Sequence, residues 1–227
     1  IIGYVETVRL MKEKLPPTTL RGGYVAGPYT LAALIMGAEE AAMAVIMNSE
    51  ELTRLCEFTT SVIRQYVDML VEAGVNVICI LEPTAVMLGP DHFRQFSSSY
   101  IQTLASRNLQ CGVDTIYHTC GNTNHLVRPM VEAGVHGISV DAREAGVNIE
   151  SIIQNTPEYV TVIGNISPTT TMLHGTPDEV RDDVYQLLEL MEPYPNFVLS
   201  TGCDLPQEIK KENIQAFMEA GRTYKVH

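Results

Sequence analysis

Short apolar runs alternate with longer amphipathic stretches along most of this chain. Apolar runs rich in Val, Ile and Tyr predict strands, whereas apolar residues recurring every three or four positions predict helices. The predicted strands span residues 22–27, 75–81, 112–117, 136–140, 159–163 and 197–200. The predicted helices span residues 28–36, 50–73, 91–108, 123–133, 148–154, 177–191 and 207–224. Strands that alternate with helices are typical of a parallel β/α architecture.

The positions of proline and glycine agree with these predicted boundaries. Pro28 stands at the start of a predicted helix, where its missing N–H costs nothing, and Gly74 and Gly134 stand where two helices are expected to end. A doubly wound sheet would also satisfy this pattern. A (β/α)8 TIM barrel is favoured because polar residues follow one strand after another, and barrel strands bring all their carboxyl ends to one mouth. These residues are Glu82, His118, Cys120, Asp141, Asn165 and Cys203.

Only six of the eight strands of such a barrel can be identified. The chain also begins at Ile1-Ile2 without a methionine, so we expect that an N-terminal segment carrying the missing elements is absent from this sequence. Its 227 residues are enough to bury a substantial core. We therefore expect residues 1–227 to form a single catalytic barrel domain.

Composition narrows the class of protein. The chain is 45% hydrophobic and 19% charged with a net charge of −12, and no basic patch is present to neutralise phosphates, which argues against nucleic-acid binding. No apolar run is long enough for a membrane span, and no signal pattern opens the chain, so a cytoplasmic protein is expected. Disulfides are unlikely in such a compartment. Cys56 and Cys79 are best interpreted as core residues, and Cys111 stays undecided.

Three of the strand-end residues have the chemistry of a metal site. His118 and Cys120 are two residues apart, and such residues in extended chain project to the same side. Cys203, after a distant strand, would complete a set of one imidazole and two thiols, which is a typical zinc set with one coordination position left for substrate. The alternative is that the cysteines are small buried apolar residues. Their shared position after predicted strands favours zinc.

Several motifs carry a resemblance to a known family. They lie at residues 27–30, 72–78, 118–121, 164–168, 175–180, 202–206 and 212–213. With these motifs the chain resembles the uroporphyrinogen decarboxylase superfamily, and more narrowly its zinc-dependent branch, the methylcobamide:coenzyme M methyltransferases. The motifs at 164–168 and 175–180 are shared broadly in the superfamily. The His-x-Cys motif with a late Gly-Cys is specific to the methyltransferases, since the decarboxylases do not use such a metal site.

The resemblance implies a methyl transfer in one-carbon metabolism of the kind found in methanogenesis. A separate corrinoid protein would carry methylcobamide as the methyl donor, and a small thiol, coenzyme M, would accept the methyl group. Coordination to Zn²⁺ deprotonates a thiol that is otherwise mostly protonated at neutral pH. The thiolate sulfur would then attack the methyl carbon and leave a thioether and a reduced corrinoid.

Three further residues are candidates for the site. The resemblance places a carboxylate near the metal at Asp141, where it would hold the fourth position at rest; the alternatives are a helix cap or an ion pair with Arg143. Family members often have Glu here. Glu82 is expected to contact substrate or orient a ligand, with capping of backbone amides as the alternative. Asn165 is expected to hold substrate or support a ligand.

Other functions remain open at this point. The same fold would serve methyl transfer to a tetrahydrofolate, for which zinc activation of a thiol is unnecessary. A uroporphyrinogen-type decarboxylase is another possibility, although that chemistry needs residues from N-terminal segments. A non-catalytic tetrapyrrole- or corrinoid-binding protein would tolerate loss of His118, Cys120 and Cys203.

Overall fold

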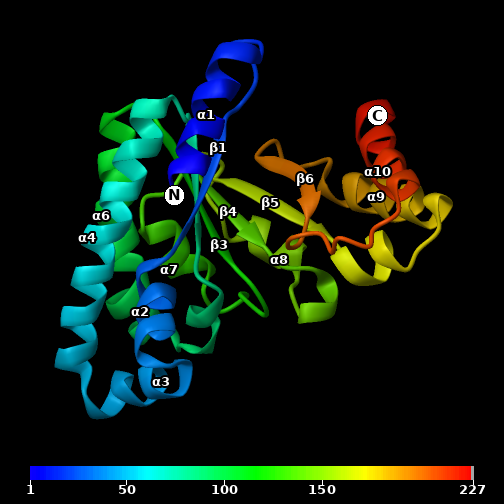
Figure 1. Ribbon diagram of the computed structural model, residues 1–227. Coiled ribbons are helices and arrows are strands. Elements are labelled where there is room, and N and C mark those ends of the chain that lie inside the picture. The colour runs from blue at the N-terminus through cyan, green and yellow to red at the C-terminus, as the bar shows by residue number, and fades with distance from the viewer. Residues whose placement is uncertain (226–227) are drawn as a thin grey trace. The chain divides into compact units, whose positions relative to one another are not determined.

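The computed structural model describes residues 1–225, and its six strands follow one another in one sheet in chain order (Figure 1). The strands are β1 (Gly22–Ala26), β2 (Val77–Leu81), β3 (Asp114–Thr119), β4 (Gly137–Val140), β5 (Thr161–Ile166) and β6 (Phe197–Thr201). The pairs β1–β2, β2–β3 and β5–β6 are parallel. The predicted parallel β/α architecture is therefore confirmed.

Helices separate every pair of consecutive strands. The α-helices are α1 (Ile2–Lys14), α2 (Pro28–Met36), α3 (Ala38–Met47), α4 (Ser49–Ala73), α5 (Pro90–Phe93), α6 (Ser99–Gln110), α7 (Val127–Glu132), α8 (Ile149–Gln154), α9 (Pro177–Met191) and α10 (Lys211–Thr223). Two short 3₁₀ helices are η1 (Pro83–Met87) and η3 (Arg143–Ala145), and two π-helical segments are η2 (Arg94–Ser98) and η4 (Pro168–Leu173).

The chain divides into two compact units. The first unit contains Ile1–Thr119 and Arg128–Gly137, and the second contains Cys120–Val127 and Ile138–His227. The expectation of a single catalytic barrel domain over residues 1–227 stays a prediction.

Helix α4 shows how sequence pattern sets packing in the first unit. Leu52, Ile63, Val67 and Leu70 recur at helical spacing and are buried, so one stripe of the helix faces the core. The helix ends at Gly74, whose φ of 104° is readily adopted only by glycine, and the Gly74 N–H bonds the last carbonyls of the helix. Helices α4 and α6 pack against β1 and β3 respectively (Figure 1).

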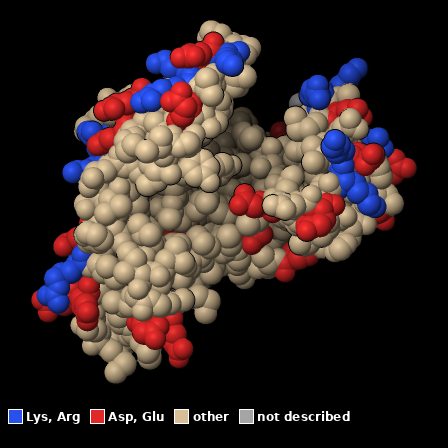
Figure 2. Space-filling model, viewed as in Figure 1, with Lys and Arg blue, Asp and Glu red and all other residues tan. Residues whose placement is uncertain are grey.

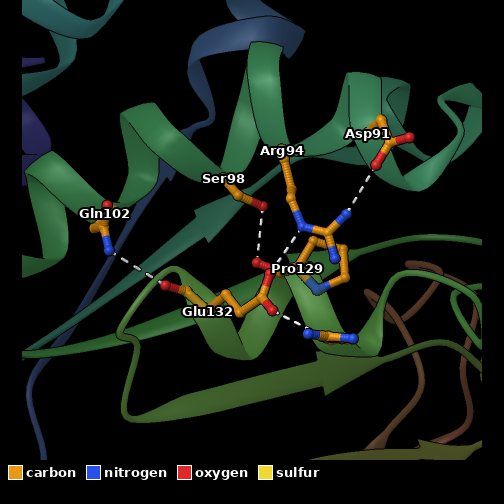
Figure 3. A network of polar contacts seen from close by, with 7 residues as sticks. Asp91, Arg94, Ser98, Gln102, Pro129 and Glu132 are labelled. Atoms are coloured by element: carbon orange, nitrogen blue, oxygen red, sulfur yellow. Dashed lines mark hydrogen bonds and ion pairs between the residues drawn. The ribbon is translucent and has the colours of Figure 1, made fainter.

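A polar network joins the segment 91–102 to helix α7 in the same unit (Figure 3). The Ser98 hydroxyl donates to the carbonyl of Pro129 at 2.8 Å inside the protein. At the surface, Arg94 pairs with Glu132 at 2.8 Å and with Asp91 at 3.1 Å. Arg94, followed by Arg128, lowers the pKa of Glu132 through hydrogen bonds to its carboxylate. Exposed ion pairs stabilise weakly, so the buried Ser98 bond is the stronger tie.

In the second unit, helix α9 has a capped start and helix α10 is fixed by the buried side-chain amide of Asn213. Helix α9 begins with a capping box in which Thr176 and Glu179 each accept a bond from the other's backbone. Its buried stripe is Val180, Val184, Leu187 and Met191. Asn213 of α10 is fully buried, and its side-chain amide donates to two carbonyls of the segment 172–175 at 2.9 Å each. Helix α10 is thus anchored beside η4.

Charged side chains line helices α1 and α4 on the face of the first unit that Figure 2 shows, with uncharged surface between them. Helices α2 and α3 expose apolar side chains, among them Leu34, Ile46 and Met47. Within residues 1–225 no single helix is long and apolar enough to cross a membrane. Helices α2 and α3 pass this test only as a pair, and they are bent by 108°.

Several predicted boundaries are wrong. Strands β3 and β5 begin and end two or three residues later than expected, so that His118 and Asn165 lie inside strands instead of after them. The predicted helix 91–108 is interrupted by the π-helical segment η2, and α10 begins only at Lys211. Helices α1 and α3 were not predicted. Boundary errors of this size arise because polar residues such as Thr119 pair in the sheet when their neighbours are buried.

Candidate metal centre

Two cysteine sulfurs lie close together in the second unit. Cys120 follows β3 and Cys203 follows β6, and their Sγ atoms are 3.6 Å apart. Two thiolates at about 2.3 Å from a tetrahedral zinc ion would be separated by about 3.8 Å. The spacing of the sulfurs therefore fits a shared zinc ion.

His118 is the third member of the group, and its closeness to Cys120 follows from their separation of two residues. It is the second residue before Cys120 and lies in extended strand, so its side chain and that of Cys120 project to the same side. The ligand atoms of His118, Cys120 and Cys203 all lie within 4.8 Å of one another. His118 is 7% exposed and the cysteines are half-buried. The three residues expected to converge are thus found together.

This donor set fits zinc and a catalytic geometry. One imidazole and two thiolates are ordinary zinc ligands, and three protein ligands leave a fourth position for an exchangeable group. The hydrogen bond with Cys203, followed by burial and the charges nearby, raises the pKa of Cys120. A dication at the sulfurs acts in the opposite direction and favours the thiolate.

Asp141 orders the loop beside the cysteines. It follows β4, and its Oδ2 accepts the Gly121 N–H at 2.7 Å while its Oδ1 accepts the Ala142 N–H at 2.7 Å. Asp141 is not among the three residues whose ligand atoms group together, and it forms no ion pair with Arg143 within residues 1–225. The carboxylate fixes the backbone next to Cys120. Ligation of the metal by Asp141 stays a prediction.

Asn165 lies in β5 and supports the same loop. Its side-chain amide donates to the carbonyl of Asp141 at 2.9 Å, and the residue is 7% exposed. Asn165 also lines a cavity of about 140 Å³ in the second unit, together with Arg143, Ser167 and Asp183. Asn165 therefore orders the backbone at Asp141, and its expected support of a metal ligand or contact with substrate stays a prediction.

Gly202 permits Cys203 to come this close. Gly202 is buried and its N–H bonds the carbonyl of Ile166 at 2.8 Å. A Cβ added to Gly202 would overlap the backbone of Asp141 and Ala142. Sequence reasoning used Gly202 only as part of a motif, whereas the structure shows the steric reason for glycine.

Glu82 caps the start of helix α2 inside the first unit. Its side chain is fully buried in the first unit, and its two carboxylate oxygens accept the backbone N–H groups of Tyr29 at 3.0 Å and Thr30 at 2.8 Å. These are donors at the first turn of α2 that have no partner within the helix. The capping role that the sequence left open for Glu82 is therefore observed, and both oxygens are engaged away from solvent. Contact with substrate or orientation of a ligand by Glu82 stays a prediction.

Sequence reasoning missed two residues joined to Glu82. Ser97 of η2 donates to Glu82 Oε1 at 2.9 Å, and the Ser97 and Tyr117 hydroxyls are 2.6 Å apart. Tyr117 stacks on Phe93 with ring centroids 5.6 Å apart. Burial raises the pKa of Glu82, against the effect of the bonds it accepts, and burial also raises the pKa of Tyr117. No signal in the run of three serines at 97–99 singles out Ser97.

Comparison with known structures supports this fold. A methyltransferase from Methanosarcina mazei matches with a TM-score of 0.85 and 28% sequence identity, over 96% of this chain and 62% of that chain. A B12-independent methionine synthase from Shewanella sp. matches with a TM-score of 0.67 and 16% identity over 96% of this chain, a likeness of fold alone. The expected TIM-barrel-like α/β class is confirmed.

Comparison with curated sequences identifies the relatives. The methylcobamide:CoM methyltransferase MtbA of Methanosarcina acetivorans is 29% identical over 224 residues, which cover 97% of this chain and 63% of the relative. A uroporphyrinogen decarboxylase of Prochlorococcus marinus is 27% identical over 208 residues, covering 88% of this chain and 57% of the relative. The chain thus spans less than two thirds of the length of these relatives. The uroporphyrinogen decarboxylase (URO-D) family model matches residues 3–224, and this chain belongs to that family.

Proposed function

We propose that this chain is the catalytic part of a methyltransferase that moves a methyl group from methylcobamide on a separate corrinoid protein to the sulfur of a small thiol, coenzyme M. The observation that carries the proposal is the group formed by His118, Cys120 and Cys203. The names of the methyltransferase relatives support the donor and the acceptor.

These three side chains would hold a zinc ion, which supplies a positive charge that lowers the pKa of a thiol bound in the remaining position. Cys120 and Cys203 would contribute thiolates, whose donation of charge to the metal would leave a bound substrate sulfur nucleophilic. His118 would contribute an imidazole nitrogen. Asp141 holds the Gly121 backbone and so keeps Cys120 in place.

The reaction balances without a further reactant. The substrate thiol loses its proton to solvent, and its sulfur forms a bond to the methyl carbon. The carbon–cobalt bond breaks with its electron pair left on cobalt. The products are a thioether and a corrinoid reduced by two electrons, which the corrinoid protein carries away.

Among the alternatives, the three-residue group favours the methyltransferase. Decarboxylation of a tetrapyrrole and methyl transfer to a tetrahydrofolate make no use of a thiol-activating metal. A protein that only binds a corrinoid would have no need for two sulfurs 3.6 Å apart beside an imidazole. Zinc content is therefore the first measurement that separates these functions.

Metal analysis of the purified full-length protein should find about one zinc per chain. Cys203→Ala should lose most of it, because three protein ligands are the usual minimum for a catalytic zinc site. Cys111→Ala is the matched control, since Cys111 is an exposed cysteine outside the group, and it should keep its zinc. Full zinc content in Cys203→Ala would contradict the proposed site.

Activity supplies the second test. The zinc-loaded protein mixed with methylcobalamin should demethylate cobalt only when a thiol is added, which is visible as a change in corrinoid absorbance. Thiol binding should also release a proton near neutral pH, and His118→Ala should abolish that release. Thiol binding that is the same in metal-free protein would favour an acceptor other than a thiol.

A further inference from the structure

A buried carboxylate cradle lies at the carboxyl ends of β2 and β3 in the first unit, and neither the metal group nor the proposed reaction uses it. Glu82 is its centre, and its oxygens accept three bonds from Tyr29 N–H, Thr30 N–H and the Ser97 hydroxyl. Every partner is a donor, so the ionised carboxylate is the form that satisfies all three.

The Glu82 side chain packs tightly against the backbone of Gly27. A Cβ added to Gly27 would overlap the Cγ and Cδ atoms of Glu82, so glycine at the start of α2 leaves the space that the carboxylate fills. The Gly27 N–H also bonds the carbonyl of Leu81 at 2.7 Å. The end of β1, the start of α2 and the end of β2 are thus joined at one residue.

Two further bonds connect the cradle to the end of β3. The backbone N–H of Glu82 donates to the carbonyl of His118 at 2.9 Å. The hydroxyl of Tyr117, one residue earlier, lies 2.6 Å from the Ser97 hydroxyl that donates to Glu82. Residues 117 and 118 are therefore held by the same carboxylate residue, one through its side chain and the other through its backbone.

Because side chains alternate along a strand, holding Tyr117 in place also constrains its neighbour His118, the metal-ligand candidate. Successive side chains of a strand point to opposite faces, so Tyr117 and His118 face opposite sides of β3. Tyr117 is fully buried and stacked on Phe93. When Tyr117 and the His118 carbonyl are both fixed, the direction of the His118 Cα–Cβ bond, from which the imidazole extends, is fixed as well.

We propose that Glu82 is a positioning residue for the metal site, which acts through Ser97 and Tyr117 and through the His118 backbone to hold the imidazole in its ligating position. The inference rests on the proposed function, because it needs His118 to bind zinc. The Glu82 side chain bonds Tyr29, Thr30 and Ser97, and within residues 1–225 it makes no hydrogen bond to the side chains of the three metal-ligand candidates. Partners of this outer kind typically change metal affinity by 10- to 100-fold.

The test compares zinc affinity, measured by competition with a chelator, in the wild type and in Glu82→Gln. Glutamine keeps the shape of the side chain but presents an amide NH₂ to a set of donors, so at least one bond is lost. We expect zinc affinity to fall about tenfold. In protein loaded with Co²⁺ in place of zinc, the visible absorption bands should also change, because they report the geometry of the ligands.

Ser97→Ala is a second variant, which keeps α2 capped and cuts only the link between Glu82 and Tyr117. It should weaken zinc binding by a smaller factor and shift the Co²⁺ bands in the same direction. This variant decides the question if Glu82→Gln fails to fold.

Asn108→Ala is the matched control. Asn108 is 2% exposed and its amide donates to the Thr115 hydroxyl at 3.0 Å, so it is a buried polar residue tied to the opposite end of the same strand. It should lower the urea midpoint of the metal-free protein and leave zinc affinity and the Co²⁺ bands unchanged.

Wild-type zinc affinity and Co²⁺ bands in both Glu82→Gln and Ser97→Ala would overturn the inference and leave the proposed function standing. Absence of zinc from the wild-type protein would overturn the proposed function and the inference with it. Equal losses of affinity in Asn108→Ala and Glu82→Gln would also overturn the inference, because the effect would then follow from stability alone.

Discussion

Glu82 and Asp141 are two carboxylates that directly follow strands, and the structure uses them in similar ways in different units. Each accepts two backbone N–H groups, Glu82 from the first turn of α2 and Asp141 from Gly121 and Ala142. Neither belongs to the group of three side chains that could hold a metal ion. A strand-end carboxylate in this fold is therefore first of all an organiser of backbone.

Their surroundings differ. Glu82 is fully buried and has a third donor in Ser97, whereas Asp141 is half-buried and lies in the same unit as both cysteines. A carboxylate that is fully enclosed by protein is out of reach of another ligand. A half-buried one is able to exchange a backbone bond for a metal or a substrate, and so the two residues differ in what they are able to do next.

A glycine stands against each carboxylate segment. A Cβ at Gly27 would overlap the Glu82 side chain, and a Cβ at Gly202 would overlap the backbone of Asp141 and Ala142. A side chain is able to move aside by rotation, but backbone moves only with its neighbours. Alanine at Gly202 should therefore be the more damaging substitution.

Gly202→Ala should cost about 3 kcal/mol of unfolding free energy, at the upper end for overpacking. It should also lower zinc content, because Cys203 is the next residue and would be displaced. Urea unfolding and metal analysis measure the two effects. Gly89→Ala is the control, since a Cβ there meets nothing within 4 Å. A Gly202→Ala protein with normal zinc content would show that the loop adapts.

Gly27→Ala should cost less, about 1–2 kcal/mol, because the Glu82 side chain has to leave its cradle while the backbone stays. Gly22→Ala, at the other end of β1, is the control: its added Cβ would lie 3.5 Å from Val77, an ordinary contact. Unfolding free energies of the two variants from urea titration test this. If Gly27→Ala is as stable as Gly22→Ala, the cradle is looser than its geometry indicates.

The sequence predicted the sheet because apolar runs and glycine boundaries are local signals. Six strands were identified at nearly their observed positions, and α9 was placed at Pro177–Met191. Helix α3 was missed because its two glutamates and small residues gave no clear start after Gly37. The π-helical segment at Arg94–Ser98 also left no local signal, because only its packing reveals it.

The three metal-binding candidates could be predicted because His118, Cys120 and Cys203 carry recognisable chemistry at strand ends. For Glu82 the sequence left substrate contact, ligand orientation and capping open, since whether a carboxylate faces solvent or the first turn of α2 depends on packing between residues 53 positions apart. Ser97 and Tyr117 were missed for the same reason. Residue type shows what a side chain is able to do, and only the fold shows what it meets.

Asp141→Ala tests the more open of the two carboxylates. If Asp141 only orders the loop, the loss should be about 1 kcal/mol of stability, as for a cap residue, with zinc retained and thiol binding at least as tight as in the wild type. Asp204→Ala, an exposed carboxylate beside Cys203, is the control. Zinc loss specific to Asp141→Ala in metal analysis would make Asp141 a ligand and widen its contrast with Glu82.

The smallest effect is expected at the exposed Glu132, which supplies a surface reference for both carboxylates (Figure 3). Arg94 and then Arg128 lower its pKa from the ordinary 4.5, so the folded state binds this proton less readily than the unfolded state. Its stabilisation is therefore present above about pH 4.5 and is lost as the pH falls through the lowered folded pKa.

Glu132→Gln should lower the urea midpoint slightly at neutral pH, and the difference from wild type should shrink in acid and in high salt, because exposed pairs are screened. Glu158→Gln is the control, since Glu158 makes no ion pair within the described residues 1–225. A difference that persists in acid and in salt would mean that Glu132 acts through its hydrogen bonds and shape. In that case the exposed Glu132 would order local structure as Glu82 and Asp141 do. The three carboxylates would then share one role whatever their burial.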